Sequence, residues 1–394
     1  MIFIAFLAAV FAVYYLQRKL FFSKMFDKIL YDAKIDTDEV FAGDDFYLYE
    51  ELTNDRAIPV PYIKVNNTLP KGLKFRLAES DREDRFMQSV QSVFVLHRHE
   101  KIRRRWRVNC TKRGVYCVGN ALLVSNDIFG LKRESLELHA KETLKSTITV
   151  LPRSIDLAEN FSSSRFQNGD VLSNRRLLSE PFLRAGTREY VSGDSMRSIN
   201  WKLSASHNKL LVNLEEYTQR RKFNVFLNMN SREIEYNRNI PSDEDAIERC
   251  ITVCASVVER VCSRDIGIRF IMNAPAVNEE ERGLPENEIG EKLFFSHKYE
   301  GRGEVMDALR MLANLKLEIT CPINKVLDHI LENHEFYCER GGLLFVTAYF
   351  EERMVNFARK LRVYGVQVVF YVTTASNNTT QIPNDIEVYF QTHF

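Results

Sequence analysis

The stretch between residues 186 and 205 contains the densest set of polar side chains suited to binding. Arginine and carboxylate groups can form bidentate ion pairs, and the Gly193-Asp194 dipeptide is typical of turns. We expect a structural clasp, in which ion pairs fix a loop with Trp201 packed beneath it, because the charges balance locally. The alternative is a loop that binds an anion or a partner through Arg188 and Arg197. The candidate residues are Arg188, Glu189, Tyr190, Gly193, Asp194, Arg197, Asn200, Trp201 and Ser204.

Other residue patterns predict no catalytic site. Cys250, Cys254 and Cys262 share one side of an expected helix with Ile and Val, and they lack the two-residue spacing of metal sites. Core packing is therefore the favoured interpretation of these cysteines. No nucleophile elbow, zinc-protease motif, Walker loop or dinucleotide fingerprint occurs in the sequence. We expect a protein that is not an enzyme and that uses no cofactor.

A basic stripe is expected on one strand. Lys101, Arg103, Arg105 and Arg107 occupy alternate positions, so their side chains share one face. The whole chain has 54 Lys and Arg against 53 Asp and Glu, a net charge of +1, and no aromatic residue is interleaved on the basic side of the strand. Nucleic acid is therefore not an expected partner, and we interpret the stripe as a solvated face or one near anionic lipid.

Short strands are expected over residues 37–151. Phe46, Leu48 and Leu52 fall on one face at a period of two. Further candidate strands follow at intervals marked by turns, with no helical pattern between them, which predicts a small antiparallel β-sandwich. Residues 152–219 are rich in Ser, Asn and Arg at their start and form a connector that carries the 186–205 stretch.

Strands and helices are expected to alternate over residues 220–394. Apolar residues recur at helical spacing from Glu244 to Cys262, and Ser242 with Asp245 resembles a capping box before this helix. Buried strands are expected at 223–227, 266–272, 343–346 and 366–372. Such alternation predicts a mostly parallel sheet covered on both faces.

The N-terminus is strongly apolar. The first 16 residues carry no charge, and counting on to Phe22 gives a length that can span a bilayer. Basic residues follow at Arg18, Lys19 and Lys24, so the positive-inside rule places the bulk of the chain in the cytoplasm. We expect a single-pass transmembrane anchor over residues 1–22 in the cell membrane. The seven Cys, an odd number, also fit a reducing compartment.

Residues 186–205 read GTREYVSGDSMRSINWKLSA. This stretch closely resembles the signature of the domain-of-unknown-function family 58, which runs R-E-Y, two residues, G-D, two residues, R, one residue, I-N-W and then S-A. Lys112 to Tyr116 and Asp127 to Leu131 are similar to further stretches of that family, with Ile128 in place of the usual Pro. The resemblance implies an α+β multidomain chain with an N-terminal transmembrane helix, a small antiparallel β-sandwich and a C-terminal α/β domain. It implies that this last domain, over residues 220–394, is Rossmann-like and similar to von Willebrand factor type A.

Domains of the von Willebrand A type often bind a divalent cation through the oxygen ligands of a D-x-S-x-S motif. Asn228 stands here in place of the carboxylate, Asn230 replaces the first Ser, and Arg232 replaces the second. Because amide oxygens bind Mg²⁺ weakly and a guanidinium repels it, we expect no metal at this degenerate position.

The resemblance implies a function as well. The resemblance to family 58 implies that this chain is a membrane-anchored, non-enzymatic scaffold or adaptor. Its implied partner is a MoxR-type AAA+ ATPase, with a role in the assembly or maturation of other proteins. The alternative from another class is a metal-dependent ligand-binding or enzymatic α/β domain, which intact metal ligands would favour. A third possibility, an extracellular adhesion-type domain, requires the opposite topology.

Overall fold

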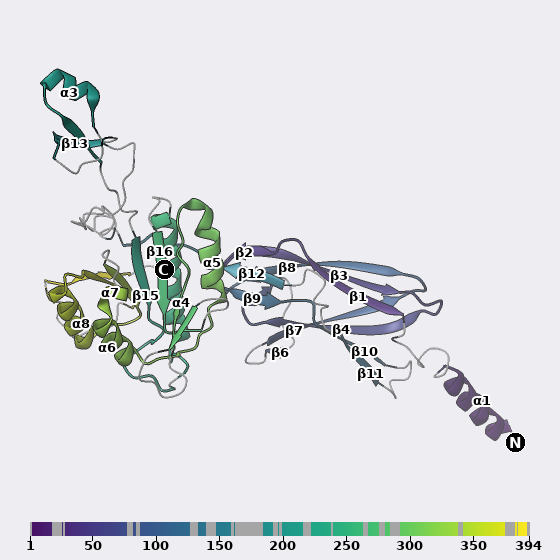
Figure 1. Cartoon of the computed structure of the whole chain (residues 1–394). Helices are drawn as coiled ribbons and strands as arrows, with labels where there is room; N and C mark the ends of the chain where they lie inside the picture. Colours follow the sequence, from purple (N-terminus) through teal and green to yellow (C-terminus); the bar gives the residue numbers. More distant parts are fainter. Residues whose placement is uncertain are drawn as a thin grey trace. The chain divides into compact units, whose positions relative to one another are not determined.

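The structure is a computed structural model of the chain. It describes residues 2–17, 26, 28–76, 82–83, 87–126, 133–138, 147–158, 161, 184–191, 196, 199–215, 222–237, 239–262, 267–275, 280–283, 292–337, 342–374, 383 and 385–391. The chain forms two compact units (Figure 1). The first is Met1–Arg153 with Leu309–Leu315, and the second is Ser154–Ala308 with Lys316–Phe394.

The first unit is built from strands after an N-terminal helix, α1 (Ile2–Gln17). Two sheets have the orders β1-β3-β8-β5 and β11-β10-β4-β7-β6, and a smaller sheet has the order β2-β12-β9. The strands are β1 (Ile29–Ile35), β2 (Glu39–Phe41), β3 (Asp45–Asn54), β4 (Val60–Pro70), β5 (Leu73–Phe75), β6 (Arg82–Glu83), β7 (Met87–Leu96), β8 (Lys101–Cys110), β9 (Gly114–Cys117), β10 (Ala121–Asn126), β11 (Arg133–Leu138) and β12 (Thr147–Leu151).

The core of this unit lies between the sheets. Burial alternates along β3, so Phe46, Leu48 and Leu52 point inward as their spacing predicts. Phe46 and Leu48 pack with Trp106 of β8 and Leu69 of β4 in one apolar cluster. The antiparallel register places Leu48 opposite Trp106, and it thereby also sets which side chains of β3 and β8 face outward.

Glu50 occupies an inward position of β3 and is only 5% exposed. Its carboxylate accepts hydrogen bonds from the indole Nε1 of Trp106 at 2.6 Å, from the hydroxyl of Tyr31 at 3.1 Å and from the side-chain amide of Asn67. Burial raises the pKa of Glu50 above its usual range. The three donors satisfy a carboxylate that would otherwise be costly to bury.

Arg113 links β9 to the segment Leu309–Leu315 within the first unit. This buried guanidinium donates hydrogen bonds to the carbonyl oxygens of Leu312 at 2.9 Å, Ala313 at 3.2 Å and Leu315 at 2.9 Å. Carbonyl groups at the end of a helix have no partner within the helix, so Arg113 satisfies the end of α5 (Val305–Asn314).

The second unit contains a seven-stranded sheet in the order β17-β18-β16-β15-β19-β20-β21. Five neighbouring strands, β16, β15, β19, β20 and β21, are parallel. The strand β18 pairs antiparallel with β16 and β17. The strands are β15 (Lys222–Leu227), β16 (Gly267–Met272), β17 (Glu280–Gly283), β18 (Lys292–Phe295), β19 (Leu343–Thr347), β20 (Val368–Val372) and β21 (Glu387–Phe390). The helices are α4 (Glu244–Cys262), the 3-10 helix η4 (Arg302–Glu304), α6 (Ile323–Glu332), α7 (His334–Tyr337) and α8 (Glu352–Val363).

Helices cover the sheet. Residues of α6, α7 and α8 pack against Phe226, Phe345 and Phe370 in one apolar cluster, and Figure 1 shows these three helices gathered on one side of the strands. The helix α4 packs against β15, β16 and β19 and has the bounds that its apolar spacing predicts. Its first turn is capped by Asp243, which accepts from the amide of Ala246 at 3.0 Å, so the predicted capping role of Ser242 is wrong.

The predicted membrane anchor over residues 1–22 is wrong. The helix α1 has 16 residues, which rise about 24 Å, whereas the hydrocarbon core of a bilayer is about 30 Å thick. Within the described part of the chain, no helix combines the length and the apolar character needed to cross a membrane. Met1 and residues 18–22 of the predicted anchor lie outside the described residues. The single-pass location in the cell membrane depended on this anchor and is contradicted with it, and the placement of the bulk of the chain in the cytoplasm loses the topology on which it was based.

The predicted fold class is also wrong as stated. It combined a transmembrane helix with an α+β multidomain chain, but strand residues outnumber helical residues in the part of the chain that the structure describes, and no described helix is long and apolar enough to span a membrane. The strands β1 to β12 of the first unit, whose alternate apolar residues are buried between sheets, account for this excess of strand.

Candidate interaction site

The signature residues lie on a small hairpin with a helix. The strands β13 (Arg184–Glu189) and β14 (Leu211–Glu215) pair antiparallel, and α3 (Trp201–His207) stands between them in the sequence. The side chain of Asn200 accepts from the amide of Leu203 at 3.1 Å and caps this helix.

Ser204 closes the hairpin onto the helix. Its hydroxyl oxygen accepts from the amide of Leu211 at 2.9 Å and lies 3.4 Å from the carbonyl oxygen of the same residue. The amide of Tyr190 donates to the carbonyl oxygen of Leu210 at 2.9 Å. Backbone and hydroxyl groups therefore hold this element together.

Among the described residues of this element, the charged signature residues Arg188 and Glu189 make polar contacts. Glu189 pairs with Lys209 at 2.6 Å, and an exposed Arg188 donates to the carbonyl oxygen of Glu189 at 3.0 Å. Lys209 lowers the pKa of Glu189 below its usual range through this hydrogen bond and its charge. Gly193, Asp194 and Arg197 lie outside the described residues.

Trp201 does not pack beneath the hairpin as we expected. Its side chain is 61% exposed at the first position of α3. Val191, Met196 and Leu210 are also exposed on this element. The hairpin therefore presents apolar side chains instead of covering them.

The degenerate metal position lies at the carboxyl end of β15, where side-chain amides form a closed network. The Nδ2 of Asn228 donates to the hydroxyl of Thr347 at 3.0 Å, and its Oδ1 accepts from the amide of Asn230 at 3.0 Å. Asn273, at the end of β16, donates to the Oδ1 of Asn230 at 3.0 Å and accepts from the amide of Met229 at 2.9 Å. The oxygens that would bind a cation are thus engaged by the protein itself.

The guanidinium of Arg232 contacts an aromatic ring. It lies 5.0 Å from the centre of the Tyr236 ring, a distance typical of a cation–π contact. Among the described residues, no three His, Cys, Asp or Glu side chains come together as a metal site does.

A clamped loop follows this network. The carboxylate of Glu235 accepts from the hydroxyl of Ser231 at 3.0 Å, from the amide of Arg232 at 3.3 Å and from the amide of Ser242 at 2.7 Å. The hydroxyl of Ser231 in turn accepts from the amide of Asp243 at 3.0 Å. One carboxylate thereby joins both ends of the loop at the start of α4.

The clamped loop exposes large apolar side chains. Ile234 is 79% exposed, Tyr236 is 88% exposed and Ile240 is 47% exposed. We call residues 231–240 the docking loop. Sequence analysis identified Arg232 but missed Glu235, Ile234 and Tyr236, although an apolar residue and an aromatic residue on either side of a glutamate after a buried strand are visible in the sequence.

The cysteines of α4 lie in the core. Cys250, Cys254 and Cys262 are buried and free, and burial raises the pKa of the Cys250 thiol to about 12. Thiols in this state are poor nucleophiles and poor metal ligands.

Comparisons with known proteins give remote similarities. No family model and no curated protein matches the chain. The CARDB domain of the PF1109 protein from Pyrococcus furiosus, solved in complex with di-metal ions, is similar at 16% identity over 32% of this chain and 96% of that chain, with a TM-score of 0.20. The native conformation of alpha-2-macroglobulin from E. coli is similar at 11% identity over 32% of this chain and 10% of that chain, with a TM-score of 0.23. At these scores the similarities carry no argument about function.

Neither of these structures is a von Willebrand A-type domain or a member of family 58. We withdraw the von Willebrand A-like label for residues 220–394, because no family model and no curated protein supports it. The resemblance of residues 186–205 to the family 58 signature stays a prediction.

Proposed function

We propose that this chain is a non-enzymatic adaptor that binds a partner protein through the docking loop. The observation that carries the proposal is the exposure of Ile234 and Tyr236 on a loop that Glu235 holds in one conformation. A preorganised loop loses little conformational entropy on binding, and exposed aromatic side chains commonly supply most of the binding energy at protein interfaces.

The partner that we propose is a MoxR-type AAA+ ATPase, with a role in the assembly or maturation of other proteins. The similarity of residues 186–205 to the family 58 signature supports this choice. The engaged amide network at Asn228 supports a binding role that needs no metal.

The proposal is tested by affinity capture of the full-length tagged chain from the native host, with and without ATP. We expect a MoxR-type ATPase among the captured proteins. The double change Ile234→Ser with Tyr236→Ser removes the apolar side chains and should abolish this capture. The matched control is Val363→Ser, because Val363 is 84% exposed at the end of α8. Absence of any AAA+ ATPase, or equal capture by the double variant, would contradict the proposal.

A further inference from the structure

The near-zero net charge of the chain conceals a division of charge along it. Residues 1–153 contain 25 Lys and Arg against 19 Asp and Glu, whereas the remaining residues contain 29 against 34. The first unit therefore carries a net positive charge.

The outward face of β3 and β8 concentrates this charge. The register pairs Tyr47 with Arg107, Tyr49 with Arg105 and Glu51 with Arg103 across the two strands. The basic stripe expected on β8 is thus joined by two tyrosines from the neighbouring strand, which the sequence of β8 alone does not show. We call this surface the Arg–Tyr face, and its residues are Tyr47, Tyr49, Glu51, Lys101, Arg103, Arg105 and Arg107.

The tyrosine rings orient the arginines. The guanidinium of Arg103 lies 4.7 Å from the centre of the Tyr49 ring, and that of Arg105 lies 4.7 Å from the centre of the Tyr47 ring. Stacking on a ring leaves the N–H groups at the edge of a guanidinium free to bind a carboxylate. Both arginines are exposed.

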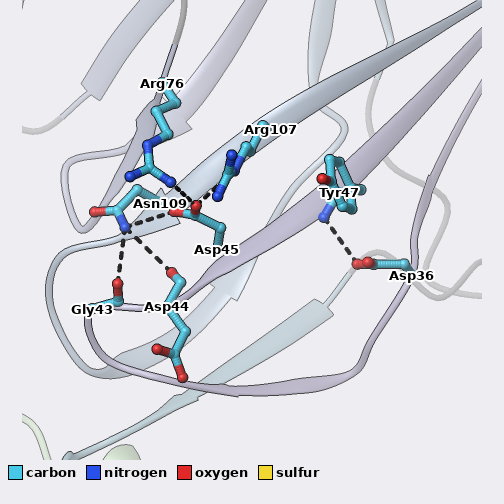
Figure 2. A network of polar contacts seen from close by, with 8 residues as sticks. All are labelled: Asp36, Gly43, Asp44, Asp45, Tyr47, Arg76, Arg107 and Asn109. Atoms are coloured by element: carbon cyan, nitrogen blue, oxygen red, sulfur yellow. Dashed lines mark hydrogen bonds and ion pairs between the residues drawn. The ribbon is translucent and has the colours of Figure 1, made fainter.

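The carboxylates on this face do not neutralise it. Lys101 pairs with Glu51 at 2.6 Å, and Arg103 lies 3.5 Å from the same carboxylate. Figure 2 shows Arg107 and Arg76 converging on Asp45 at one end, where Arg107 contacts the carboxylate at 2.7 Å. Two cations therefore share each of these carboxylates, and Arg105 has no carboxylate partner in the described part of the chain.

We propose that the Arg–Tyr face binds an extended acidic segment of a partner protein. Alternate residues on a strand are about 6.8 Å apart, so Arg103, Arg105 and Arg107 match carboxylates at alternate positions of an extended peptide. Arginine is well suited to such pairs because it can bind a carboxylate in bidentate geometry. This inference does not depend on the docking loop or on the ATPase.

A protein segment fits this face better than single-stranded nucleic acid. Nucleic acid of that kind needs aromatic rings on which bases stack, but the rings of Tyr47 and Tyr49 are already covered by guanidinium groups.

The test uses the full chain and a fluorescein-labelled peptide of alternating Glu and Ser, followed by fluorescence anisotropy. We expect binding at low ionic strength that is largely lost at about 1 M salt, where the Debye length is about 3 Å. The double change Arg103→Glu with Arg105→Glu should weaken binding at least about tenfold, since it replaces attraction by repulsion. The control Arg98→Glu reverses an exposed basic residue in the turn between β7 and β8 and should change the affinity less than about twofold.

Circular dichroism establishes that each variant is folded. No binding of the peptide by the wild-type chain would overturn the proposal, and so would an equal loss in the Arg98→Glu control. Tighter binding of an oligothymidylate, or of vesicles that contain phosphatidylserine, than of the acidic peptide would also overturn it in favour of those ligands.

Discussion

The carboxylate of Glu235 accepts a hydrogen bond from the hydroxyl of Ser231 at 3.0 Å and thereby closes the loop that carries Ile234 and Tyr236. The same carboxylate accepts from the backbone amide of Ser242 at 2.7 Å, so the first residue of the docking loop and a residue just after it meet at one side chain. A backbone held in this way keeps the two large apolar side chains exposed to solvent.

The first prediction concerns this clamp. Glu235→Gln removes the charge that strengthens the hydrogen bonds, and we expect the free energy of unfolding to fall by about 1 to 2 kcal/mol. Amide hydrogen exchange should show lower protection at residues 231–243 than in the wild type. The matched control Asp328→Asn removes an exposed carboxylate from α6 and should leave both measurements unchanged. Unaltered protection in Glu235→Gln would show that the carboxylate does not fix the loop.

The second prediction concerns which signature residues hold the hairpin and its helix together. If Ser204 closes the hairpin, Ser204→Ala should lower the free energy of unfolding by about 1 kcal/mol, because the bond to the Leu211 amide is lost. Trp201→Ser should change it by less than about 0.5 kcal/mol, as exposed side chains usually do. Chemical denaturation of both variants provides the measurement. A larger loss for Trp201→Ser than for Ser204→Ala would restore the expectation that the indole packs beneath the hairpin.

Periodicity predicted the elements well where one face is apolar. The helix from Glu244 to Cys262 and the inward face of Phe46, Leu48 and Leu52 follow from spacing alone, because burial of apolar area dominates there. Glu50 lies on that same inward face, and its burial depends on donors from Trp106, Tyr31 and Asn67 on three other strands. Such partners come together only through tertiary pairing, which no local pattern reports.

In the candidate sites, too, the sequence predicts the local positions but not the partners that the tertiary fold brings together. The positions of Asn228 and Asn230 after a buried strand could be predicted, but the network that engages them needs Asn273 and Thr347 from two neighbouring strands. Trp201 was misjudged because large aromatic residues are usually buried, and its exposure at the start of α3 depends on how the hairpin folds back.

The third prediction concerns pH. Burial raises the pKa of Glu351 to about 7, and the neighbouring carboxylate of Glu233 adds to the rise. Because the folded state holds this proton more tightly than the unfolded state does, its stabilising contribution is complete below the ordinary pKa near 4.5 and is lost as pH rises through about 7. Glu233→Gln removes the like charge and should lower the pKa of Glu351.

A carbon-13 NMR titration of the side-chain carboxyl groups measures this change. The free energy of unfolding of Glu233→Gln should also fall less steeply between pH 4.5 and 7 than that of the wild type. The control Glu335→Gln alters an exposed carboxylate on α7. An unchanged midpoint for Glu351 in Glu233→Gln would show that the two carboxyl groups do not interact.

The fourth prediction is that Mg²⁺ does not bind at the end of β15. The Oδ1 of Asn228 already accepts the amide of Asn230 at 3.0 Å, and a cation would have to break this bond and gain only neutral oxygen ligands. Calorimetric titration of the full chain with Mg²⁺ should give no heat beyond dilution. Saturable heat that disappears in Asn228→Ala would contradict this prediction.

The central claim is that Ile234 and Tyr236 on the docking loop form the contact with the partner. Its most direct test is the dissociation constant of the purified chain for the captured MoxR-type ATPase, measured by biolayer interferometry. We predict that Ile234→Ser with Tyr236→Ser raises this constant at least about tenfold, whereas Val363→Ser leaves it within about twofold of the wild-type value. Equal dissociation constants for the wild type and the double variant would contradict the account.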